Sequence, residues 1–501
     1  MGIVIRQSIK TTAVSYIGFA IGYVNSLFLF PLVLSKEQIG LTRLLISVSF
    51  LFATFASLGS GNIPIRFFPY FRDEKKQHNG ILAFVLSIGM IGFFLFVIVF
   101  LLLKDVIFNI YSKNSPLLLD YYFYFIPFTL IVVFTTIFES YLIVQQKPIL
   151  PALVREILMR LLLMVGLTAI YFGFFSFNTF ATSIIIYYAL GLLILVLYIK
   201  KEKVLFLKPN LQIVKSPHLK EMIKYAAYII FGTASATIIG NIDSLMLSAY
   251  SGLGSAGIYT IAFFIAAVIE IPKRSISQVV IPIVSQANKD GDIPKLKELY
   301  QKTSLNQLIV GGLIFLGIWC NIDNIFKLIP NGEIYAPGKW VVFYIGLSKL
   351  FDMATGVNQE IVGTSKYYKI DLLFYIFLAV IAVITNLIFI PKFGITGAAM
   401  ASAISIFLFN TIRFFFLLYV FRIQPFSLST LKVLAVFVLT FLISYLVSPF
   451  HNFILDIFLR SLLIIILFGG LVLLMNVSED VKKVVEAIIK RIKDFFNVNQ
   501  K

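Results

Sequence analysis

Long apolar stretches separated by short polar segments recur along the whole chain. Each stretch has about 20 residues, the length that a helix needs to cross a hydrocarbon layer of about 30 Å. The alternation of apolar and polar positions that is typical of membrane β-strands does not occur. The pattern predicts fourteen membrane-spanning helices, at residues 12–34, 42–64, 80–103, 119–145, 153–175, 178–200, 224–250, 256–285, 304–328, 338–363, 370–391, 394–421, 430–449 and 453–476.

The composition agrees with an all-α polytopic membrane protein. Hydrophobic residues make up 59% of the 501 positions and charged residues only 13%, with a mean hydropathy of +0.95. These values lie far outside the range of soluble globular domains. No segment resembles a separate soluble domain, and we expect the first span to be a helix of the body and not a removable signal peptide.

The charges of the loops predict the orientation. If the N-terminus is inside, most of the 42 Lys and Arg residues fall in cytoplasmic segments and few in outer ones. Because Lys and Arg accumulate on the cytoplasmic side, we expect both termini to be cytoplasmic. The net charge of +18 then faces anionic lipid headgroups, so no nucleic-acid partner is needed to explain it.

The end of the chain has the pattern of an amphipathic helix. Residues 478–496 place valines, isoleucines and a phenylalanine on one stripe and lysines and an arginine elsewhere around the helix. We expect this tail, 478–501, to lie on the membrane surface. The alternative is a docking helix for a partner protein.

An internal repeat relates the two parts of the chain. NSLFL at 25–29 matches DSLML at 243–247, and SKEQIGLTR at 35–43 runs alongside GLGSAGIYT at 252–260, with Gly40 opposite Gly257. Both copies have the same expected orientation, which indicates a parallel duplication of about six helices. The predicted domains are an N-terminal six-helix bundle (1–200), a basic cytoplasmic linker (201–223), a C-terminal six-helix bundle (224–425), two additional helices (426–477) and the tail (478–501).

Three segments resemble a known family. IDSLMLSAYSGLGSAGIYTIAFFI at 242–265 and PKFGITGAAMASAIS at 391–405 are similar to segments of the multidrug/oligosaccharidyl-lipid/polysaccharide exporter superfamily. The fourteen helices and FFPYFR at 67–72 most resemble the bacterial O-antigen and polysaccharide flippases of the Wzx type. The resemblance implies two six-helix bundles around a central cavity, with two helices added at the C-terminus. It also implies flipping of an undecaprenyl-diphosphate-linked oligosaccharide across the bacterial inner membrane by alternating access.

Two adjacent cations interrupt an apolar stretch, IEIPKRSISQVV at 269–280. A diphosphate that crosses a medium of low dielectric constant needs cations, and the planar guanidinium of Arg binds phosphate oxygens in pairs. Lys273 and Arg274 are therefore the first candidates for contact with the substrate. The alternative is packing or anchoring at the membrane surface, with Glu270 neutralising one of the two charges.

Other charged residues inside the predicted spans are further candidates. Lys349 and Asp352 are three residues apart, a spacing that suits either an internal ion pair or a cation site with a titratable neighbour. Arg160 and Arg66 are additional candidate cations of the cavity. Arg413 and Arg460 are more typical of anchors and ion pairs.

Coupling to an ion gradient requires a group that binds H+ or Na+, and carboxylates inside the membrane commonly do so. Asp243 lies in the resembling segment and has the uncharged Asn25 as its counterpart in the first half. Glu270 and Asp352 are the next candidates, followed by Glu139 and Glu360. For Asp243 the alternative is a hydrogen bond between helices.

Enzymatic functions find little support in the sequence. The three histidines do not cluster, Cys320 is the single cysteine, and no phosphate-binding loop or nucleophile motif occurs. We therefore expect no enzyme activity, cofactor or metal site. The expected partners are the lipid-linked oligosaccharide, the coupling ion, membrane lipids and polysaccharide polymerase machinery. Two alternatives remain, a multidrug exporter of the same superfamily and a membrane-embedded polysaccharide polymerase or ligase.

Overall fold

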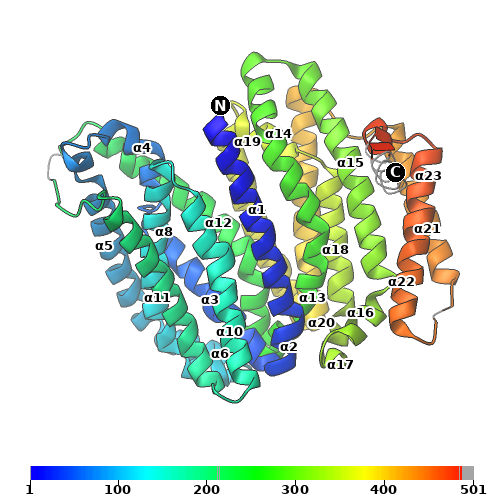
Figure 1. Cartoon of the computed structure of the whole chain (residues 1–501), viewed down its shortest axis with the longest axis horizontal. Coiled ribbons are helices and arrows are strands. Elements are labelled where there is room, and N and C mark those ends of the chain that lie inside the picture. Colours follow the sequence, from blue (N-terminus) through cyan, green and yellow to red (C-terminus); the bar gives the residue numbers. More distant parts are fainter. Residues whose placement is uncertain (1, 211–212, 214, 449, 484–485, 488–501) are drawn as a thin grey trace, which may run out of the picture. The chain divides into compact units, whose positions relative to one another are not determined.

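The computed structural model describes residues 2–210, 213, 215–448, 450–483 and 486–487. Within these residues every regular element is a helix (Figure 1). Ten of the helices are long and apolar enough to cross a membrane, or up to twelve if each of two bent helix pairs counts as one span. The expected fold class, an all-α multi-pass membrane protein, is confirmed.

The first six predicted spans are helical. They correspond to α1 (Gly2–Val24) with a π-helix (Asn25–Leu29) and α2 (Phe30–Val33); α3 (Lys36–Ala56); α5 (Ile81–Leu102); α8 (Phe125–Val144); α9 (Ile149–Ala152) with a π-helix (Leu153–Leu158) and α10 (Met159–Tyr171); and α11 (Phe177–Lys201). Short helices lie between them: α4 (Ile63–Phe71), α6 (Lys104–Tyr111) and α7 (Pro116–Asp120).

The remaining spans follow the same order along the chain (Figure 1). They are formed by α12 (Leu219–Ser251); α13 (Leu253–Ala267), a 3-10 turn (Val268–Glu270) and α14 (Ile271–Asp290); α15 (Ile293–Trp319) with α16 (Ile322–Leu328); α17 (Gly332–Tyr335), α18 (Lys339–Ala354) and α19 (Asn358–Thr364); α20 (Tyr368–Phe416); α21 (Leu428–Leu446); and α22 (Phe453–Ile464), a π-helix (Ile465–Gly469) and α23 (Gly470–Leu474).

The helix α20 contains two of the predicted spans. Gly394 breaks it with a φ of +56°, a conformation that glycine adopts without steric cost. The two arms run antiparallel, because Thr385 Oγ1 lies 3.1 Å from Ser405 Oγ and Arg413 pairs with Asp371. Residues 149–171 form one more helix, whose three charged residues make it too polar to be among the ten. Each of the fourteen predicted spans thus corresponds to a helix, a helix pair or one arm of α20.

Packing divides the chain into two compact units. One comprises Met1–Ile261 and Asn386–Ile395, and the other comprises Ala262–Thr385 and Thr396–Lys501. The core of the first unit is rich in aromatic rings, and that of the second gathers residues of α15, α18, α21 and α22 around Phe315 and Phe468. These units follow the packing of helices and not the repeat, so the six-helix domains remain a prediction.

A reciprocal contact joins α3 to α13 inside the first unit. A Cβ added to Gly40 would overlap the carbonyl oxygen of Leu253, and a Cβ added to Gly257 would overlap that of Lys36. Lys36 and Leu253 occupy equivalent positions in the two copies of the repeat, as do Gly40 and Gly257. Each copy therefore presents the same glycine to the same backbone position of the other copy.

The predicted tail is described only at its beginning. Ser478 Oγ donates a hydrogen bond to Asn306 Oδ1 (2.8 Å), and Asn306 Nδ2 donates one to Asp480 Oδ2 (2.9 Å), which holds the start of the tail against α15. Residues 484–485 and 488–501 lie outside the described residues, as do residues 211, 212 and 214 of the predicted linker. The surface location of the tail stays a prediction.

Candidate functional site

A break between α13 and α14 creates the setting for the first group of charges. The chain forms a 3-10 turn at Val268–Glu270, and Pro272 stands in the first turn of α14, where its missing N–H group leaves no helical hydrogen bond unmade. Ile269 is fully buried in the core of the second unit. The turn thereby brings Glu270, Lys273 and Arg274 next to α18.

Lys273 is buried and paired. Its Nζ atom lies 2.5 Å from Asp352 Oδ2 of α18, and its side chain is 10% exposed. Asn410 of α20 donates to the other carboxylate oxygen of Asp352 at 3.0 Å. The Asn410 carbonyl in turn accepts hydrogen bonds from Thr355 Oγ1 (3.0 Å) and Asn358 Nδ2 (2.8 Å). Asp352 is therefore held by a cation and an amide from two different helices.

Glu270 is shared by two cations. Lys349 of α18 forms an ion pair with it, and Arg274 Nε lies 3.6 Å from Glu270 Oε1. The side chain of Arg274 is 63% exposed, whereas that of Lys349 is 18% exposed. Lys349 and Asp352 do not pair with each other, because each finds a partner on the α13–α14 segment. One of the two interpretations of their spacing, an ion pair between Lys349 and Asp352, is therefore wrong.

These five residues form the charge cluster, defined as Glu270, Lys273, Arg274, Lys349 and Asp352. The charge cluster has three cations and two carboxylates, and Glu360 brings a third carboxylate close to Lys273. Arg274 contributes its most exposed group. Glu360 of α19 is buried nearby, and its Oε2 atom has no hydrogen-bond partner within the described part of the chain.

Asp243 forms hydrogen bonds to two other helices. Its Oδ2 atom accepts from the hydroxyl of Tyr259 on α13 (2.5 Å) and its Oδ1 atom from Nδ2 of Asn386 on α20 (2.8 Å). The residue is 7% exposed. The hydrogen bond between helices that the sequence offered as one interpretation is confirmed, and a role in coupling stays a prediction.

The counterpart of Asp243 is equally buried. Asn25 is 3% exposed, lies in the π-helix that follows α1, and donates from Nδ2 to the backbone oxygen of Arg160 (2.7 Å). The guanidinium of Arg160 lies 2.7 Å from Glu156 Oε2, in a position where Gly22 leaves room for it. Arg160 thus forms an ion pair with Glu156 of its own helix, beside α1. Its contact with a substrate stays a prediction.

The remaining predicted cations lie apart from the charge cluster in the chain. Arg66 is exposed on α4 and stacks on Tyr225, with 4.9 Å from its guanidinium carbon to the ring centroid. Arg413 lies 2.5 Å from Asp371 and 4.0 Å above the ring of Phe409. Arg460 lies 3.1 Å from Asp456. The prediction that Arg413 and Arg460 each form an ion pair with a carboxylate is confirmed. Glu139, a further candidate for coupling, lies 3.4 Å from Arg155.

Three residues of these sites were not predicted from the sequence. Asn410 and Asn386 each stand alone in an apolar stretch of α20, and Tyr259 is one of 24 tyrosines. A lone amide inside a membrane span is a usable signal, since it needs a hydrogen-bond partner there. A tyrosine gives no such signal, because its ring suits many apolar positions.

Comparisons with known proteins agree with this architecture. The sequence profile of the family described as polysaccharide biosynthesis protein matches residues 4–288, more than half of the chain. The uncharacterized membrane protein MJ1068 of Methanocaldococcus jannaschii is 22% identical over an alignment of 311 positions that covers 58% of this chain. The match spans 56% of the length of that relative.

Two solved structures share the fold. The lipid II flippase MurJ, in an inward closed conformation, superimposes with a TM-score of 0.72 at 15% identity, over 92% of this chain and 98% of its own. An inward-facing multidrug resistance MATE family transporter of the MOP superfamily gives a TM-score of 0.60 at 15% identity, over 83% of this chain and 97% of its own. The chain therefore belongs to the polysaccharide biosynthesis protein family and has the fold of the multidrug/oligosaccharidyl-lipid/polysaccharide exporter superfamily.

Proposed function

We propose that this protein flips an undecaprenyl-diphosphate-linked oligosaccharide, the repeat unit of an O-antigen or capsule, from the inner to the outer face of a bacterial cytoplasmic membrane. Membership of a polysaccharide biosynthesis family supports a sugar-bearing substrate. The fold shared with a lipid II flippase supports a lipid-linked one. In the proposed orientation both termini are cytoplasmic, and polysaccharide polymerase machinery takes up the product.

The observation that carries the proposal is the shared carboxylate of Glu270. It pairs with both Lys349 and Arg274. A diphosphate can replace Glu270 as the partner of both cations, and Arg274 can bind two of its oxygens through a planar guanidinium. Lys273 stays with Asp352 and supports the position of α18 relative to α14. Binding of the substrate would therefore change both ion pairs of Glu270 and leave the pair of Lys273 and Asp352 intact.

The Arg274 contact predicts a graded effect of substitution. Arg274→Gln should reduce flipping about tenfold, since a hydrogen bond to a charged group is worth about 1.5–3 kcal/mol. Arg274→Lys should lie in between, because an ammonium keeps the charge and loses the paired geometry. The measurement is complementation of a flippase-deficient strain, with protein levels checked by immunoblot.

Lys302→Gln is the matched control. It removes an exposed cation of the same unit, which pairs with Glu298, and should leave transport unchanged. Full activity of Arg274→Gln would place the diphosphate elsewhere, and equal loss in both Arg274 variants would indicate packing and not recognition.

Coupling to H+ or Na+ is proposed at Asp243. Its carboxylate joins α12 to α13 and α20 through two neutral donors, so neutralising its charge would alter contacts of three helices at once. Glu270 and Asp352 are the next candidates for coupling, and each pairs with a cation.

Asp243→Asn should keep the protein folded and reduce gradient-driven flipping about tenfold, since it preserves size and hydrogen bonding but removes the titratable charge. Flipping by proteoliposomes with and without an ion gradient measures this. Tyr259→Phe separates the two roles, because it removes a hydrogen bond and keeps the carboxylate. If Tyr259→Phe causes the same loss, Asp243 acts through packing alone.

The rival transport function is export of cationic drugs. Such substrates call for an acidic, aromatic site, and the charge cluster has a surplus of cations. Rescue of drug resistance without rescue of polysaccharide assembly would favour this rival. A polymerase or ligase would instead lengthen the glycan in the same assay, which gel analysis of the products distinguishes.

A further inference from the structure

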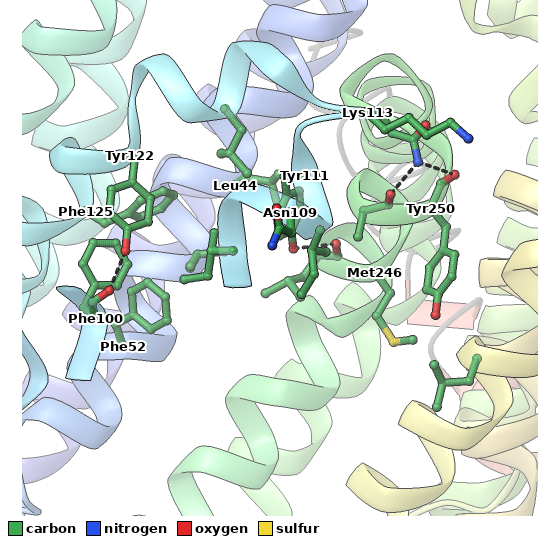
Figure 2. A pocket seen from close by; sticks show the side chains of 18 residues that line it. Leu44, Phe52, Phe100, Asn109, Tyr111, Lys113, Tyr122, Phe125, Met246 and Tyr250 are labelled. Carbon is green, nitrogen blue, oxygen red and sulfur yellow. Dashed lines mark hydrogen bonds between the residues drawn. The ribbon is translucent and has the colours of Figure 1, made fainter. Parts of the chain in front are cut away.

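A cavity of about 720 Å³ lies inside the first unit, and neither Asp243 nor any member of the charge cluster lines it. It is bounded by α3, α5, α8 and the last turns of α12, with the segment that carries α6 and α7 beside it (Figure 2). This volume is within the range of ligand-binding cavities, about 300–1,000 Å³.

One wall of the cavity is a cluster of aromatic rings. The Phe52 centroid lies 5.5 Å from that of Phe100 and 5.8 Å from that of Phe125, and Tyr122 stacks on Phe100 at 4.3 Å. The Tyr122 hydroxyl donates to the backbone oxygen of Phe100 at 2.5 Å, so the polar atom of this wall is already bonded. The apolar side chain of Met246 from α12 lies across from these rings (Figure 2). This part of the cavity suits hydrocarbon.

The polar groups lie toward the other end. Asn114 donates from Nδ2 to the backbone oxygens of Ala249 (2.8 Å) and Tyr250 (3.1 Å), so its amide is occupied. Lys113 is exposed next to it and pairs with no carboxylate within the described part of the chain. Figure 2 shows Lys113 and Tyr250 at the opposite end from the aromatic cluster. A single cation thus stands at one end of a long apolar cavity.

The surroundings have the character of a membrane surface. The ammonium of Lys104 lies 5.3 Å from the ring centroid of Phe108 and 5.5 Å from that of Phe123. Lysine and amphipathic aromatic residues gather at the level of the lipid headgroups. The cavity therefore extends from headgroup depth toward the hydrocarbon layer, on the side that the loop charges predict to be outside.

We propose that this cavity binds the hydrocarbon chain of an anionic lipid, with the lipid phosphate at Lys113. A methylene group takes roughly the volume of a water molecule, about 30 Å³, so the cavity has room for one ordinary acyl chain or for part of a polyprenyl chain. The lipid is either a polyprenyl phosphate or an anionic phospholipid of the bilayer, which share this chemistry.

Native mass spectrometry of the purified full chain tests the proposal. The probes are undecaprenyl phosphate, phosphatidylglycerol and the zwitterionic phosphatidylcholine. Ile110→Trp and Ala249→Trp fill the cavity from two different sides, and Val99→Trp adds the same ring on the exposed face of α5 as their control. Lys113→Gln removes the cation, and Lys327→Gln is its control on another exposed lysine.

The two cavity-filling variants should lower the affinity for the anionic lipids at least about tenfold, since each methylene left unburied costs about a factor of four. Lys113→Gln should lower it about fivefold and leave phosphatidylcholine unaffected. Preference for undecaprenyl phosphate would identify the polyprenyl lipid as the occupant, and equal binding of phosphatidylglycerol would identify the bilayer lipid.

The proposal is overturned if both cavity-filling variants, with melting temperatures like that of Val99→Trp, bind the anionic lipids as the unmodified protein does. It is also overturned if Lys113→Gln weakens binding no more than Lys327→Gln. Because the assay measures binding and not flipping, either result leaves the proposed transport function untouched.

Discussion

Lys273→Gln is expected to lower the free energy of unfolding by about 3 kcal/mol, the lower end for a buried ion pair, because it leaves the partly buried carboxylate of Asp352 without its cation. Asn410 still donates to that carboxylate, but one neutral donor does not replace an ammonium. Thermal unfolding in detergent, followed by circular dichroism and by the fraction of protein that stays monodisperse, measures the loss.

The double variant Lys273→Gln/Asp352→Asn should recover most of this stability, since two neutral amides can bond to each other where two charges did. Asp352→Asn alone should be destabilised to a similar degree as Lys273→Gln. If the double variant is as unstable as the sum of the single ones, the pair contributes no coupling energy. The side chain of Lys273 would then not depend on Asp352, and it would be a candidate to bind the diphosphate.

Gly40→Leu and Gly257→Leu are each expected to abolish transport. Even a methyl group at these positions overlaps a backbone oxygen of the facing helix, and backbone cannot rotate away as a side chain does. Overpacking a close contact costs about 1–3 kcal/mol when side chains yield, and more is expected here. Flipping in the complementation strain and melting temperature are the readouts.

Gly240→Ala and Gly317→Ala serve as controls, because a Cβ at either position meets no atom within 4 Å. Both should retain transport. Retained activity in Gly257→Leu would mean that α3 and α13 do not need this approach during the transport cycle.

The fourteen spans could be predicted because a membrane constrains both the length and the composition of a helix. The reversal at Gly394 was predicted as a gap between two spans, although apolar residues continue on both sides of it. The 66° bend between α15 and α16 was not predicted. A bend of that kind depends on the side chains that pack beside it. Hydropathy indicates only whether a segment lies in the membrane or in water.

The members of the charge cluster were predicted, and so was the pairing of Glu270 with one of the two adjacent cations, but the partners of Lys349 and Asp352 were not. Lys349 and Asp352 are close in sequence, and Lys273 and Asp352 are 79 residues apart, yet the distant pair forms. The rotation of α18 about its axis decides which partner each side chain meets, and that rotation is set by the packing of the whole second unit. Local spacing therefore identifies charges that need a partner without identifying the partner.

The reciprocal contact of Gly40 and Gly257 has the geometry that two identical subunits make across a twofold axis, where each presents the same patch to the other. A chain with only one six-helix half would be self-complementary at this point. Fusing two copies end to end would preserve the contact without any new surface, because each copy already carries both the glycine and the backbone position that the other copy contacts. Such a fusion would leave the two halves free to differ elsewhere, as Asn25 and Asp243 differ, and would keep this contact symmetric.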